Sequence, residues 1–191
     1  SLSRRFADNP AVLGYEIINE PQPGTFLEPF SFASGQLYPF YKRVIQALTG
    51  VRDGLPTCPS DQPTSLNSSC AYPDLGIRTN QIIFFEPSAI RNLLDFAPQS
   101  SVPFSSHANL VYSPHVYTHV FTLDQSVLHL PPNNTVWPPS YDFAWQTAWN
   151  EAQGMNASLL VTEFGAGAGW ASDNQVVAPN IAAQEKYAAA G

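Results

Sequence analysis

The chain has 191 residues, of which 44% are hydrophobic and only 12% are charged. Charged residues make up about a quarter of an average globular chain, and disorder requires low hydrophobicity together with high charge. The composition therefore predicts a packed domain. A formal net charge of −7 argues against nucleic acid or an anionic membrane as a partner. No apolar run approaches the roughly 20 residues that cross a bilayer, so no membrane span is expected.

Strand-like and helix-like segments alternate along the chain. The expected elements are, in order, a helix end at residues 4–7, an apolar strand over 12–19, a helix over 33–49, a loop over 50–80, a strand over 82–85, a short helix after Pro87, a strand over 110–113, a loop over 116–140, a helix over 141–153, a strand over 159–162 and a helix over 181–190. This alternation is typical of parallel βαβ units. The strands are continuous apolar runs, as expected for a sheet covered on both faces.

Cysteines and glycosylation motifs indicate the compartment. Cys58 and Cys70 flank a Pro-, Ser- and Asn-rich stretch, and a disulfide closing this loop would contribute about 3 kcal/mol. Two free thiols in a cytosolic protein are the alternative, whereas a zinc site lacks further Cys or His ligands at suitable spacing. Three N-glycosylation motifs begin at Asn67, Asn133 and Asn156. Together these features predict a protein that is secreted, extracellular, or in a lysosomal or vacuolar lumen.

Polar side chains follow each predicted strand at its C-terminal end. They are Asn19 and Glu20, Glu86, His115 with Tyr117, and Glu163. A β/α barrel collects its active-site residues at this face, but an open doubly wound sheet also places its ligand there, so the strand ends leave both folds open. A barrel needs eight strands in about 250 residues. Four strands therefore lead us to expect that residues 1–191 form part of a longer (β/α)8 TIM barrel.

Glu20 and Glu163 would face one cleft in a barrel. Two carboxylates in one cleft are what glycoside hydrolysis requires, one protonated to assist the leaving oxygen and one ionised to attack the anomeric carbon. A separation of about 5–5.5 Å gives retention and about 6.5–9.5 Å gives inversion. The sequence leaves the distance and the assignment of the two roles open. His115 and Tyr117 can donate hydrogen bonds that keep a carboxylate ionised.

The segments VLGYEIINEP, residues 12–21, and LLVTEFGAG, residues 159–167, resemble the two signature segments of glycoside hydrolase family five, the cellulase-like β/α barrels. The segments IIFFEP and LVYSPHVY look like its fifth and sixth strands. The resemblance implies that the chain holds about strands four to seven and lacks the first three and the last. It further implies that Glu20 is the general acid/base and Glu163 the nucleophile of a retaining enzyme.

The same resemblance assigns the neighbouring residues. Asn19 would bind the sugar 2-hydroxyl, and His115 and Tyr117 would line the site. We expect Glu86 to pair with an Arg or a His rather than to react, while Trp170 can either stack on a sugar ring or pack in the fold.

The finer match is to the endoglycoceramidase-related branch, whose members cleave β-glucosidic bonds in glycosphingolipids or related glucolipids. The predicted function is a retaining β-glycosidase acting on such a glucolipid or on a β-glucan, without a metal or cofactor. Oligomeric state is not predicted. The alternative is a catalytically inactive barrel fragment or sugar-binding relic, because the segments that carry the family's Arg and His on the first strands and its Trp on the eighth are absent from this sequence.

Overall fold

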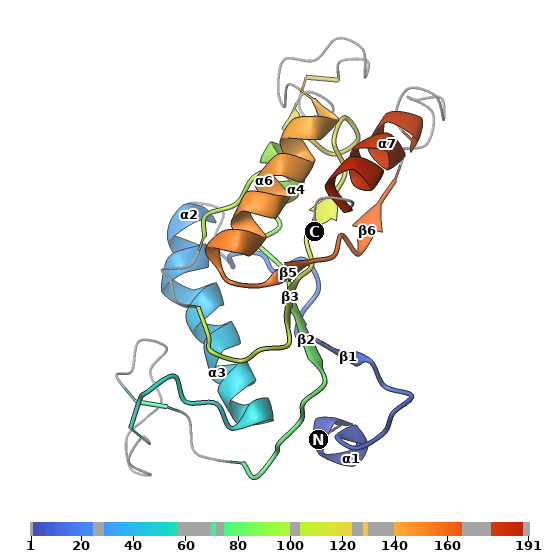
Figure 1. Ribbon diagram of the computed structural model, residues 1–191. Helices are drawn as coiled ribbons and strands as arrows, with labels where there is room; N and C mark the ends of the chain where they lie inside the picture. The colour runs from blue at the N-terminus through green and yellow to red at the C-terminus, as the bar shows by residue number, and fades with distance from the viewer. Residues whose placement is uncertain are drawn as a thin grey trace.

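The computed structural model describes residues 2–24, 29–56, 70–71, 75–99, 104–123, 128–129, 140–165 and 177–188. Helices and strands alternate along these residues (Figure 1). They are α1 (Leu2–Phe6), β1 (Gly14–Glu16), α2 (Pro29–Phe32), the π-helix η1 (Ala33–Leu37), α3 (Tyr38–Thr49), β2 (Ile82–Phe85), α4 (Arg91–Leu94), β3 (Leu110–Tyr112), β4 (His115–Val116), α6 (Tyr141–Gly154), β5 (Ser158–Leu159), β6 (Glu163–Phe164) and α7 (Val177–Ala188). None of the described helices has the length and apolar character needed to cross a bilayer.

The main sheet has four parallel strands in the order β1-β2-β3-β5. Each strand pairs with the next strand along the chain, so the order never reverses within the described sheet. A doubly wound sheet reverses its strand order at a switch point, where its ligand binds. Right-handed crossovers between successive parallel neighbours place the connecting helices on one face. The order of the described sheet is the one expected for an arc of a barrel, and these strands contain no switch point.

A second, two-stranded parallel sheet, β4-β6, continues two strands of the first. β4 follows β3 after a break at residues 113–114, and β6 follows β5 after a break at 160–162. Hydrogen bonds bridge these breaks, from the Leu160 N–H to the Tyr112 carbonyl at 3.0 Å and from Thr162 Oγ1 to the Ser113 carbonyl at 3.3 Å. The strand predicted over 159–162 is thus divided, but its direction and neighbour are maintained up to Glu163.

The first strand is shorter than predicted. β1 covers only Gly14–Glu16, although the Ile17 N–H still donates to the Phe84 carbonyl at 3.2 Å. The chain leaves the extended conformation before Glu20, whose φ is +44°. Gly14 permits the close approach of the first two strands, because a Cβ there would lie 2.1 Å from the Ile82 carbonyl oxygen.

Helix α3 covers the outer face of the sheet. Tyr41 and Ile45, one turn apart on α3, are completely buried, as are Ile83 and Phe85 on β2, and all four belong to one core cluster. The Tyr41 and Phe85 ring centroids are 5.9 Å apart in an edge-on contact. The helix ends at Thr49 because Gly50 adopts a left-handed conformation with φ of 75°.

Helix α6 packs against the strand ends that carry the candidate site. Ser140 caps it by accepting a hydrogen bond from the Phe143 N–H at 3.2 Å. A second core cluster joins α6, α7 and the strand ends, and consists of Val116, Ala144, Trp145, Val161 and Ala183. This packing fixes the positions of β4 and of the segment that leads into β6.

A buried polar network lies between α4, α6 and the strands. Arg91 is completely buried, and its guanidinium donates to Glu151 Oε2 at 2.9 Å, to the His115 carbonyl at 3.1 Å and to the Ala144 carbonyl at 2.8 Å. Glu151 also accepts from the Tyr112 hydroxyl at 2.6 Å. A charge this deeply buried is tolerated only when its partners satisfy it. The network therefore ties the backbone of β4 to the two helices.

Candidate active site

The register of the second sheet places two predicted site residues side by side. His115 at the start of β4 is the direct pairing partner of Glu163 at the start of β6. Residues that pair in a sheet direct their side chains to the same face. His115 Nδ1 accordingly lies 3.3 Å from Glu163 Oε2. Tyr117, two positions after His115, donates its hydroxyl proton to the same Glu163 oxygen at 2.9 Å.

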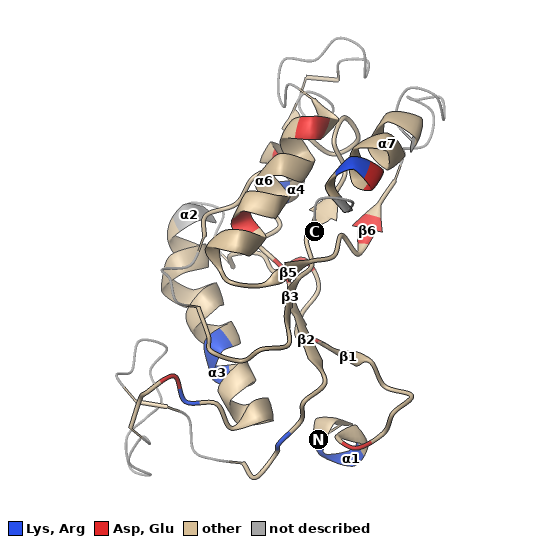
Figure 2. Cartoon of the chain, viewed as in Figure 1, with Lys and Arg blue, Asp and Glu red and all other residues tan. Residues whose placement is uncertain are grey.

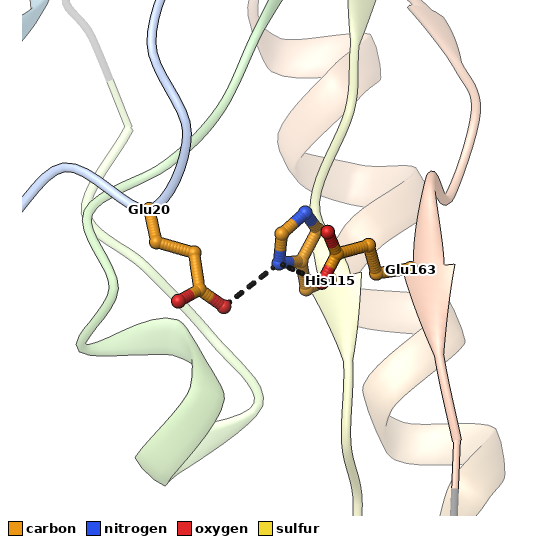
Figure 3. Close-up of side chains that lie close together, drawn as sticks. All are labelled: Glu20, His115 and Glu163. Atoms are coloured by element: carbon orange, nitrogen blue, oxygen red, sulfur yellow. Dashed lines mark hydrogen bonds and ion pairs between the residues drawn. The ribbon is translucent and has the colours of Figure 1, made fainter.

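Glu20 reaches the same imidazole from the other side. Its Oε1 lies 2.9 Å from His115 Nδ1, and Figure 3 shows the imidazole between the two carboxylates. One oxygen of Glu20, one oxygen of Glu163 and one His115 nitrogen all lie within 4.8 Å of one another. The two glutamates that are distant in sequence therefore meet at one place.

Glu86 contacts both His115 and the backbone of Glu20. It is 2% exposed, its Oε1 lies 3.3 Å from His115 Nε2, and its Oε2 accepts a hydrogen bond from the Glu20 backbone N–H at 2.8 Å. Glu86 therefore contacts a histidine, as expected for this residue, and also holds the backbone of Glu20. A glutamate with φ of +44° lies in the left-handed region that non-glycine residues rarely adopt, and the Glu86 bond stabilises that conformation.

The surroundings of His115 determine its charge. Burial acts to lower the pKa of the imidazole, but hydrogen bonds to Glu86 and Glu20 and the negative charges of Glu86 and Glu163 raise the pKa to about 9. The ring is therefore protonated at neutral pH, and both of its nitrogens form ion pairs with carboxylates. Desolvation, followed by the hydrogen bond to Glu163, raises the pKa of Tyr117 to about 12, so its hydroxyl remains a donor.

No protein-family model matches the chain. Over 170 residues the sequence is 29% identical to Endoglycoceramidase I of Rhodococcus hoagii (strain 103S), a match that covers 87% of this chain and 30% of that protein. The structure resembles the crystal structure of an endogalactoceramidase with a TM-score of 0.59 and 25% sequence identity, over 86% of this chain and 28% of that one. The chain is similar, at modest identity, to part of each of these two proteins.

The predicted similarity to the endoglycoceramidase-related branch and the predicted partial TIM barrel are both confirmed, at modest sequence identity. The chain has the fold of part of a TIM barrel, which agrees with the strand order described above. It spans less than a third of the length of either relative.

The roles of several predicted residues stay predictions. Asn19 is exposed beside Glu20, and its bond to a sugar hydroxyl is untested. Asn156 is exposed in the turn after α6, as a glycosylation site must be. Four further predicted positions lie outside the described residues, namely Cys58, Asn67, Asn133 and Trp170. The disulfide to Cys70, glycosylation and secretion are therefore untested.

Two contacts of the site were not predicted from the sequence. Asn92 on α4 donates its side-chain amide to Glu20 Oε1 at 2.7 Å. Glu16 on β1 forms a side-chain hydrogen bond with Glu86, and desolvation together with that bond raises the pKa of Glu16 to about 7. Glu16 lies four residues before Glu20 in a segment already of interest, so it could have been considered. Asn92 lies in a weakly periodic region that carries no such signal.

The same side chains could also be considered as metal ligands. Glu20, His115 and Glu163 each offer one ligand atom. A protonated imidazole has no free lone pair for a metal, however, and the pKa of His115 is about 9. At neutral pH the hydrogen-bonded arrangement of three carboxylates around one imidazolium accounts for the geometry.

The raised pKa of His115 predicts how stability depends on pH. Because the folded-state pKa of about 9 exceeds the ordinary value of 6.5, the stabilisation is complete below about pH 6.5 and is lost as the pH rises through 9. The loss should be on the order of 3 kcal/mol. Denaturant unfolding of the wild type and His115→Gln at pH 6.5 and 9.5 measures it. The variant should lose most of this dependence, while His129→Gln, at an exposed position, should keep it.

Proposed function

We propose that the endoglycoceramidase-like chain carries the two catalytic glutamates of a retaining β-glycosidase that releases the sugar of a glycolipid. The observation that carries this proposal is the meeting of Glu20 and Glu163 at His115, with oxygens of the two carboxylates within 4.8 Å of each other. Retaining enzymes hold their carboxyl groups about 5–5.5 Å apart, whereas inverting enzymes leave room for a water between them. The short approach supports retention.

Glu163 suits the role of nucleophile. Tyr117 and His115 both contact its Oε2, and these two contacts hold that oxygen in place. The second oxygen, Oε1, can then attack the anomeric carbon. The bond from that carbon to the glycosidic oxygen breaks, and a covalent glycosyl–enzyme ester forms.

Glu20 suits the role of acid and base. In the first step it gives its proton to the glycosidic oxygen, so that the aglycone departs as a neutral alcohol. In the second step the Glu20 carboxylate takes a proton from water. The water oxygen attacks the anomeric carbon, releases Glu163 and yields the sugar with its original configuration.

A pocket beside Glu20 supports an apolar aglycone. Its volume is about 410 Å³, and it is lined by Glu20, Gln22, Pro23, Ala89, Ile90, Asn92, Leu93 and Phe121. The acid protonates the leaving oxygen, so the aglycone must lie on the Glu20 side of the site. Ile90, Leu93 and the half-exposed Phe121 would contact a lipid chain there. The names of the two relatives agree with a ceramide-linked sugar.

A hydrolysis screen with stereochemical readout tests the proposal. The full-length protein is incubated with glucosylceramide, longer glycosphingolipids, a steryl glucoside and carboxymethylcellulose. We expect hydrolysis of at least one of the lipid-linked substrates, with the β-anomer of the sugar appearing first by NMR. Preference for carboxymethylcellulose would overturn the lipid assignment. First appearance of the α-anomer would overturn retention, and sugar binding without hydrolysis would favour the non-catalytic alternative.

A further inference from the structure

Asn92 holds one oxygen of Glu20. Its side-chain nitrogen lies 2.7 Å from Glu20 Oε1. An ionised carboxylate can only accept hydrogen bonds, so the amide must present its NH2 group to this oxygen. His115 Nδ1, 2.9 Å away, contacts the same oxygen. Two donors therefore converge on Oε1.

The other oxygen of Glu20 has a different environment. Among the described residues no hydrogen bond to Glu20 Oε2 is found, and Figure 3 shows this oxygen directed away from His115. When Glu20 is neutral, its proton sits on one oxygen, and that oxygen becomes a donor. An oxygen that faces two N–H donors cannot also direct a proton at them. The proton is thereby restricted to Oε2.

The backbone around Asn92 is fixed from two sides. Arg91, the residue before it, is completely buried and hydrogen-bonded to Glu151. The Asn92 N–H donates to the Ala89 carbonyl at 3.0 Å, and the Ala89 N–H in turn donates to the Pro21 carbonyl at 2.9 Å. The helix that carries Asn92 is thus connected directly to the residue after Glu20. A donor held on such a support is preorganised for its acceptor.

We infer that Asn92 is a positioning residue, which fixes the Glu20 side chain so that its acid proton lies on Oε2, the oxygen directed away from His115. This inference rests on the proposed function. It adds a residue that specifically serves protonation of the leaving group, and it gives Asn92 no part in the attack by Glu163.

Leaving-group dependence tests the inference. Wild type, Asn92→Ala and Asn92→Asp are compared on a dinitrophenyl β-glycoside, which departs without acid assistance, and on an alkyl β-glycoside, which needs it. The sugar is the one hydrolysed in the screen. We expect both variants to lose about 10-fold or more in kcat/KM on the alkyl glycoside, because general acid catalysis contributes roughly 10²–10⁴-fold. On the dinitrophenyl glycoside the loss should stay below about 3-fold.

The activated substrate also reports folding, since a variant that turns it over at a normal rate has an intact site. Asn150→Asp makes the same substitution at an exposed position of α6 and should change neither rate. Equal losses on both substrates, or no loss on either, would overturn the role of Asn92. If Glu163→Gln is also as active as the wild type, the proposed function itself is wrong, whereas an inactive Glu163→Gln with unaffected Asn92 variants rejects only the inference.

Discussion

Glu163→Gly is expected to lower kcat for a glycolipid substrate by about 10⁴-fold or more, as is found when a covalent nucleophile is removed. No ester can form without this carboxylate, while Glu20, His115 and Glu86 keep their mutual contacts. The Glu163 side chain is 45% exposed, so a small anion can reach the space that it leaves. Sodium azide should therefore restore turnover on an activated glycoside and give a glycosyl azide of inverted, α configuration.

Two substitutions that each remove one negative charge serve as matched controls for this prediction. Glu163→Gln should be inactive, whereas Glu185→Gln, at an exposed position of α7, should retain wild-type kcat. Activity is measured by release of the sugar, and the azide product is identified by NMR. Wild-type turnover by Glu163→Gln without azide would show that the nucleophile has been wrongly assigned. A β-configured azide product would instead indicate that Glu163 acts as the acid/base.

Arg91→Met is expected to lower the free energy of unfolding by about 3–5 kcal/mol, the usual effect of removing one partner of a buried ion pair. The substitution leaves the Glu151 carboxylate buried without its cation, and it leaves the His115 and Ala144 carbonyls without their donors. Denaturant unfolding of the full-length protein measures the change. In Arg91→Met/Glu151→Leu the uncompensated charge is gone, so part of the loss should be recovered.

An exposed ion pair with a similar N–O distance provides the comparison for the Arg91 substitution. Lys186 lies 2.8 Å from Asp142 and Arg91 lies 2.9 Å from Glu151, but the side chains of the first pair are 59% and 56% exposed. Lys186→Met should therefore change stability far less than Arg91→Met does, because solvent screens the exposed pair. A similar effect of both substitutions would mean that burial does not determine the contribution of Arg91.

Local signals in the sequence predicted much of the fold. The apolar spacing over 33–49 predicted the helical segment that the structure divides into η1 and α3, and the apolar run over 82–85 predicted β2. Both signals depend on residues close together in the chain. The choice between a barrel and an open sheet depends instead on which strands become neighbours. Polar strand ends could not decide it. The pairing of each strand with its successor agrees with a barrel, and the likeness to a solved glycosidase structure decides it.

For the candidate site, too, the sequence predicted individual residues but did not predict which of them contact one another. Glu20, His115 and Glu163 were predicted because each follows or begins a strand, and parallel strands bring such positions to one edge. The pairing of His115 with Glu163 requires the register of β4 and β6, which periodicity does not reveal. Asn92 and Arg91 lie on a four-residue helix whose importance comes entirely from partners distant in sequence.

Charge is unevenly distributed around this site. Figure 2 marks the acidic residue of β6 in red; blue basic segments lie away from it on α1 and α3 and close to it on α7, where Lys186 pairs with Asp142. The described carboxylates of Glu20, Glu86 and Glu163 share one imidazolium. An anionic headgroup would be repelled by such a cluster, so for the proposed activity we expect neutral sugars to suit the site better.

The left-handed backbone of Glu20 has a consequence for the evolution of this protein. A non-glycine residue with φ of +44° destabilises the folded state by about 1–3 kcal/mol relative to an unstrained one. Glycine would remove that strain, but it would also remove the carboxylate. If Glu20 has the proposed acid/base role, stability and turnover therefore favour different residues at this position.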